Sequence, residues 1–133
     1  MALGKIKADT LEHSTAGTVD TQFVVNGSAK AWAEIAAGGA SLSDSFNFSS
    51  IDDDGTGEYG LNFTNAMSNA NYSANLTLSV NHGSGSSSIR YVCIEGKTTS
   101  SVEIDSAYAS GSAVFTSYDL ELNANALVHG DLA

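Results

Sequence analysis

The residues best suited to metal chemistry in this chain are three consecutive aspartates, Asp52, Asp53 and Asp54, which Gly55 follows. Clustered carboxylate oxygens are the ligands that calcium prefers. An EF-hand loop, however, carries a glutamate six residues after its glycine, and Leu61 occupies that position here. We therefore expect a solvated hairpin turn in this run, because Asp tolerates turn conformations well, and cation binding by the run is left open.

The three histidines are a second set of potential metal ligands. His13, His82 and His129 lie in three separate segments and share no ligand spacing. We therefore expect each of them at the surface. A trimer could place three copies of one histidine around its axis, so a metal site on such an axis stays open as an alternative.

The single cysteine, Cys93, lies within the apolar run 89–94, and one cysteine excludes an intramolecular disulfide framework. Free cysteine is among the most buried residue types, so we expect an inert, buried thiol rather than a nucleophile. The sequence contains no nucleophile elbow, P-loop, dinucleotide fingerprint or zinc-protease helix. Any two of the fifteen acids could form a glycosidase pair, but no motif supports one. We expect no catalytic residue, no cofactor and no metal.

The aromatic side chains divide into expected contact residues and expected core residues. Trp32, Tyr108 and Tyr118 are expected at an exposed surface or an interface. Trp and Tyr combine a large contact area with a polar group, which suits sugar or protein partners. The aromatic residues that fit core positions are Phe46, Phe48, Tyr59, Phe63, Tyr72, Tyr91 and Phe115.

The charge of the chain limits its partners. Five basic residues stand against fifteen acidic ones, which gives a net charge of −10. Nucleic-acid binding depends on a basic patch, and the sequence offers none. No stretch approaches the roughly 20 apolar residues of a membrane span, and no apolar signal segment follows the amino-terminal lysines. We expect no nucleic-acid partner, no membrane insertion and synthesis in a cytoplasm.

Apolar residues alternate with polar ones along much of the chain, which is the pattern of half-buried strands. The expected strands are residues 19–25, 45–51, 59–64, 71–80, 89–95, 101–108 and 113–122, whereas 29–36 fits a strand or a short helix. Residues 45–64 predict a hairpin, because Asp54-Gly55 and Thr56-Gly57 supply turn residues between two strands. The run 89–95 is apolar on both faces, which is typical of a central strand.

These elements predict one domain with an extension. Residues 1–18 are polar and lack a period, so we expect an amino-terminal arm for anchoring or trimerisation, ordered by a partner chain. Residues 19–133 form the expected β-sandwich domain. The predicted fold class is all-β, an antiparallel β-sandwich of about seven or eight short strands with an extended N-terminal arm, since turn signals recur roughly every 8 to 12 residues.

Three blocks of the chain resemble tail-fibre and other virion structural proteins of tailed bacteriophages. The most specific block runs from Ser45 to Thr64, where Gly, Tyr and Asn-Phe-Thr positions are held at fixed spacing, and it continues to residue 72. The others are residues 3–32 and 128–133, so the resemblance covers most of the chain. The chain departs from the family at Asp54, Gly60 and Ser68, where Asn, Thr and Pro are common.

The resemblance implies a non-enzymatic virion structural protein, part of a tail fibre or similar appendage involved in host attachment. It implies a homotrimer assembled in the host bacterial cytoplasm, whose arm contacts its own subunits or other virion proteins. Host surface polysaccharide or protein is the implied external partner. Two alternatives stay open, a capsid decoration or head-spike protein and, third, a small carbohydrate-active enzyme.

Overall fold

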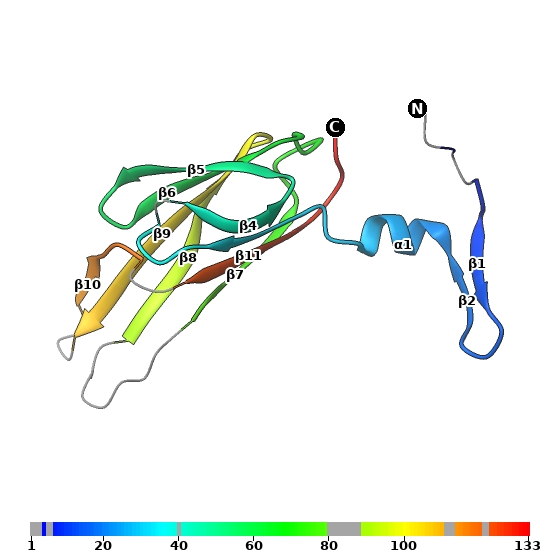
Figure 1. The fold of residues 1–133 in the computed structure, drawn as a ribbon, viewed down its shortest axis with the longest axis horizontal. Helices are drawn as coiled ribbons and strands as arrows, with labels where there is room; N and C mark the ends of the chain where they lie inside the picture. Colours follow the sequence, from blue (N-terminus) through cyan, green and yellow to red (C-terminus); the bar gives the residue numbers. More distant parts are fainter. Residues whose placement is uncertain (1–3, 5–6, 40, 80–88, 111–113, 121–122) are drawn as a thin grey trace.

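The structure is a computed structural model that describes residues 4, 7–39, 41–79, 89–110, 114–120 and 123–133. Its described part consists mostly of antiparallel strands, with one short helix near the amino terminus (Figure 1). Two sheets form a sandwich, and a separate hairpin and the helix, within residues 10–27, form an arm that extends away from it. From here on, the arm is this segment, which runs past residue 18. The predicted all-β antiparallel sandwich with an amino-terminal arm is confirmed.

The first sheet of the sandwich has four strands in the order β4–β3–β11–β7. Its strands are β4 (Leu42–Phe46), β3 (Ala31–Ile35), β11 (Ala124–His129) and β7 (Ser73–Leu78). Residues 29–36, which fit either a strand or a helix, thus contribute strand β3. Ala31, Ala33 and Ile35 face the core at alternate positions, each at most 2% exposed. The two-residue period of this segment is therefore a strand period.

The second sheet has five strands built around β9 (Ser101–Ser110). β9 pairs with β8 (Ile89–Lys97) along most of its length, with β6 (Glu58–Phe63) through its first half and with β10 (Val114–Ser117) through its second half. β5 (Phe48–Gly55) pairs with β6. The core lies between the two sheets and contains Tyr59, Leu61 and Ile104 from this one.

The predicted hairpin is confirmed in β5 and β6, but two details differ. The turn consists of Thr56 and Gly57, so the three aspartates lie on the end of β5 rather than in the turn. Phe46 does not share a strand with Phe48, because Asn47 between them has a positive φ of 59°. The chain changes sheets at this residue, and Phe46 ends β4 of the four-stranded sheet.

The expected strand over residues 19–25 is wrong beyond Asp20. β1 (Thr10–His13) and β2 (Gly17–Asp20) form a hairpin, and helix α1 (Thr21–Gly27) follows directly. Asp20 occupies the N-cap position with extended backbone, and the side-chain hydroxyl of Thr21 donates to the carbonyl oxygen of Ala8 at 2.7 Å. A short run of apolar residues has no period that separates a helix from a strand, which explains the error.

The expected central strand at 89–95 is also wrong. β8 pairs only with β9 in the described part of the chain, so it is an edge strand of its sheet. Val92 and Ile94 pack against the core, whereas Cys93 points outward and is exposed. The expectation of a buried thiol is therefore wrong, because adjacent residues of a strand face opposite sides.

The expected aromatic core is confirmed in part. Phe48, Tyr59, Phe63 and Tyr72 are buried. Phe48 and Phe63 stack with ring centroids 4.9 Å apart, and Tyr72 meets Phe63 edge-on at 5.6 Å. The remaining three residues, Phe46, Tyr91 and Phe115, were wrongly assigned to the core: Phe46 and Phe115 are exposed, and Tyr91 is only half-buried.

Candidate functional site

The outward face of the four-stranded sheet carries a row of three large apolar side chains. Trp32 lies on β3 between buried alanines, so its side chain points away from the core. Directly opposite it are Phe46 on β4 and Leu127 on β11. Trp32 and Leu127 are each 39% exposed, and Phe46 is 52% exposed. We call Phe46, Trp32 and Leu127 the outer aromatic row.

Polar residues border the outer aromatic row on one side. Glu34 lies two residues after Trp32 on β3, and the strand register places Asp44 of β4 and Asn125 of β11 opposite it. The amide nitrogen Nδ2 of Asn123 donates to Oε1 of Glu34 at 3.0 Å. The row is thus an apolar strip beside two carboxylates and an amide, an arrangement that suits contact with another macromolecule.

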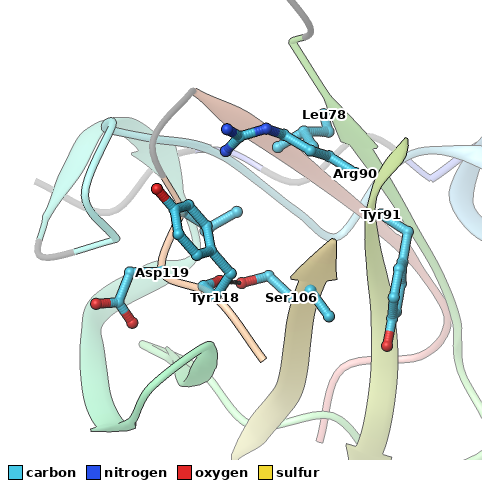
Figure 2. Close-up of a pocket in the computed structure, with 8 residues that line it drawn as sticks. Leu78, Arg90, Tyr91, Ser106, Tyr118 and Asp119 are labelled. Atoms are coloured by element: carbon cyan, nitrogen blue, oxygen red, sulfur yellow. Dashed lines mark hydrogen bonds between the residues drawn. The ribbon is translucent and has the colours of Figure 1, made fainter. Parts of the chain in front are cut away.

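The structure brings Tyr108 and Tyr118 together at a second place. Their rings meet edge-on with centroids 5.2 Å apart, and the guanidinium of Arg90 lies 5.0 Å from the centroid of Tyr118. Figure 2 shows Tyr118 and Arg90 at a small pocket that Leu78, Tyr91 and Asp119 also help to line. Of the three predicted contact residues, two are therefore neighbours, and Trp32 lies apart from them on the other sheet.

Two hydrogen bonds to Ser106 fix the backbone of Tyr118. Its N–H donates to the carbonyl oxygen of Ser106 at 3.0 Å, and the hydroxyl of Ser106 donates to the carbonyl oxygen of Tyr118 at 2.5 Å (Figure 2). The next residue, Asp119, accepts a hydrogen bond from the N–H of Gly57 at 2.9 Å. The segment that carries Tyr118 is thus fixed to both β9 and the β5–β6 turn. Together with the contacts of its ring with Tyr108 and Arg90, this fixed backbone lets Tyr118 act as a contact surface with little loss of conformational entropy on binding.

The arm presents a third candidate surface; the sequence predicted an arm that contacts a partner chain but not the residues that form this surface. Its exposed apolar residues are Leu11, Val19, Phe23, Val24 and Val25, with exposures from 41% to 63%. Leu11 and Val19 lie opposite each other in the β1–β2 hairpin, and the other three are consecutive in α1. The sequence feature that could have predicted this surface is the run Phe23-Val24-Val25. Because residues 19–25 were predicted to form a strand of the sandwich, these side chains were not expected on a contact surface.

The titratable groups of the described residues give little support for catalysis. Partial burial, followed by the nearby carboxylate of Asp105, raises the pKa of the Cys93 thiol, which disfavours the nucleophilic thiolate. Burial, followed by the carboxylate of Glu103, raises the pKa of Tyr72 to about 12. Its hydroxyl donates to the carbonyl oxygen of Ser101 at 2.7 Å, so this phenol has a structural role.

Four of the acidic residues line a pocket at the surface. Asp54, Glu58, Glu95 and Glu103 line it. Within the described ranges, no group of three or more histidine, cysteine or carboxylate side chains has a geometry that could hold a metal ion. The carboxylate of Asp52 has a partner in the same hairpin, because its Oδ2 accepts a hydrogen bond from Nδ2 of Asn62 at 2.7 Å.

The two histidines that the structure describes lie in different sheets. His13 belongs to the arm, where its Nδ1 accepts hydrogen bonds from the N–H groups of Thr15 and Ala16 at 3.3 and 3.1 Å. His129 ends β11, and His82 lies outside the described residues.

In the described part of the chain, no helix is long and apolar enough to cross a membrane.

Comparisons with known proteins add no assignment to this geometry. No family model, no curated protein and no solved structure matches the chain. The basis for a functional proposal is therefore the fold, the outer aromatic row, the half-buried Tyr108–Tyr118 cluster, the exposed arm and the sequence blocks described above.

Proposed function

We propose that this chain is a non-enzymatic structural protein of a tailed-bacteriophage virion, which forms part of a tail fibre or similar appendage and helps it to attach to a host. The observation that carries the proposal is the arm. β1, β2 and α1 contain no buried residue, although five of their side chains are large and apolar. Such a surface marks a contact with another chain.

The shape of the apolar surface on α1 favours more than two subunits. Phe23, Val24 and Val25 are consecutive, and successive helical residues are about 100° apart, so the three side chains cover roughly 200° of the helix surface. One flat partner covers only one side of such a helix. A helix close to a threefold axis meets two neighbours, which agrees with the homotrimer that the sequence resemblance implies.

The Tyr108–Tyr118 cluster is the surface that we assign to the external partner, a host surface polysaccharide or protein. It combines two half-buried tyrosine rings, the guanidinium of Arg90 over the ring of Tyr118, and the carboxylate of Asp119. Sugar rings stack on aromatic faces, and their hydroxyl groups bond to charged and polar side chains. Several weak sites in one trimer would bind a repetitive surface through avidity.

Immunogold electron microscopy of intact virions, with antibody against the recombinant chain, tests the proposal. Gold confined to the tail supports an appendage protein. Gold distributed over the head supports a capsid decoration protein instead, a role for which an arm that grips the shell is equally suited. Absence of the chain from purified virions contradicts the proposal, and release of sugars from host polysaccharide by the purified protein contradicts its non-enzymatic part.

A further inference from the structure

The link between the arm and the sandwich keeps α1 away from the outer aromatic row of its own chain. The N–H of Ser28 donates to the carbonyl oxygen of Val24 at 3.1 Å, and the N–H of Lys30 donates to that of Val128 on β11 at 2.8 Å. The ammonium group of Lys30 also donates to the carbonyl oxygens of Val25 and Ser28. The short link is therefore tied to the helix and to the sheet, and α1 leads outward (Figure 1).

Two apolar surfaces in each chain thus lack an intramolecular cover among the described residues. One is the arm helix, with Phe23 at 63% and Val25 at 60% exposure. The other is the outer aromatic row, which spans three adjacent strands of a sheet. Trp32 lies only five residues after the last residue of α1, so the two surfaces occur next to each other at the same end of the chain.

The charges beside the outer aromatic row favour its contact with α1 over its contact with the same row of another copy. If two identical sheet faces met, Glu34 and Asp44 of one copy would approach the same carboxylates of the other, in a chain of net charge −10. Like charges that are brought together at an interface disfavour association. α1 contains no charged residue, since its sequence is Thr-Gln-Phe-Val-Val-Asn-Gly. The part of the helix that carries Phe23, Val24 and Val25 can therefore lie beside Glu34 and Asp44 without repulsion, provided that Asp20 at the N-cap points away from them.

We infer that α1 of one copy packs on the outer aromatic row of a second copy. The inference rests on the proposed self-association through the arm and names the surface that receives it. If each helix docks on the next copy in one direction, the contact is heterologous and repeats from copy to copy until a ring closes; two copies that exchange their helices would instead form a closed dimer. One side of α1 covers the row, and the remaining apolar residues of the helix meet the next helix near the axis.

Cross-linking of the full-length protein tests the inference. Two variants in a Cys93→Ser background, Val24→Cys and Leu127→Cys, are co-expressed, and one carries a mass tag. Mild oxidation is expected to yield mixed covalent dimers at least tenfold faster than the control pair Val24→Cys and Phe115→Cys. Phe115 is a suitable control because it is an exposed apolar residue on the other sheet.

The outcomes separate this inference from the proposed function. An oligomeric mass with no mixed cross-link above the control overturns the docking of α1 on the row and leaves the self-association intact. A monomeric mass overturns both. A second variant, Trp32→Ser, changes an outward side chain and is expected to weaken self-association at least tenfold while circular dichroism stays unchanged; an unaltered association constant contradicts the inference.

Discussion

Replacement of Phe23 by serine is expected to weaken self-association without weakening the fold. Phe23 is 63% exposed in the single chain and belongs to α1, which contains no buried residue. A buried phenylalanine removes roughly 200 Å² from water, so a partner that covers the exposed part of Phe23 buries about 125 Å². At about 25 cal/mol per Å², this contact stabilises the assembly by about 3 kcal/mol for each arm.

A loss of about 3 kcal/mol for each arm corresponds to a rise of about 150-fold in the dissociation constant for each arm contact, and every arm of the trimer carries the substitution. Sedimentation equilibrium over a range of concentrations measures this change. The control is Phe115→Ser, because Phe115 on β10 is the same residue type and is also 63% exposed. We expect this control to leave the dissociation constant unaltered.

The thermal stability of the dissociated chain distinguishes the two possible roles of Phe23. The arm makes no core contact in the described residues, so Phe23→Ser is expected to change the free energy of unfolding of the monomer by no more than about 0.5 kcal/mol. Lower monomer stability together with unchanged association would mean that the arm packs on its own chain, and it would refute the reasoning.

Three further predictions concern the sandwich. Tyr72 has a pKa of about 12 in the folded chain, against an ordinary value of 10.0, so its protonated form contributes stability that is complete below pH 10 and is lost as the pH rises toward 12. The loss amounts to about 3 kcal/mol in the free energy of unfolding. Urea unfolding measures it, and Tyr72→Phe should not show it. Gly57→Ala is expected to destabilise the fold by at least about 2 kcal/mol, because φ is 80° and an added Cβ would lie 2.4 Å from the carbonyl oxygen of Ser106. In the same denaturation experiment Gly17→Ala should cost less, because an added Cβ at this residue, with φ of 93°, meets no atom within 4 Å. Cys93 is exposed with a raised pKa, so a disulfide-exchange reagent should label the native protein fully, at a rate that keeps increasing above pH 9.0; protection of the thiol in the native monomer would contradict its placement.

The sequence predicted the sandwich best where a strict period coincided with clear turn residues. Tyr59, Leu61 and Phe63 alternate without interruption, and all three are buried on β6. The same reasoning failed at Phe46, although it lies two residues before Phe48. Asn47 adopts a left-handed conformation between them, and a period of two carries no information about a change of sheet.

The candidate surfaces were only partly predictable for a related reason. Trp32 was expected at the surface from its residue type, and its place between buried alanines on β3 gives it an outward direction. Its neighbours Phe46 and Leu127 come from strands far apart in sequence, so their contact depends on strand order. The pairing of Tyr108 with Tyr118 likewise required the fold of β9 and the segment after β10.

The molar mass of the purified full-length chain by light scattering, at micromolar concentration, tests the central claim most directly, because the whole account depends on an arm that joins copies of the chain. The account predicts a mass of three times 13.7 kDa. A mass of 13.7 kDa across that concentration range would contradict it.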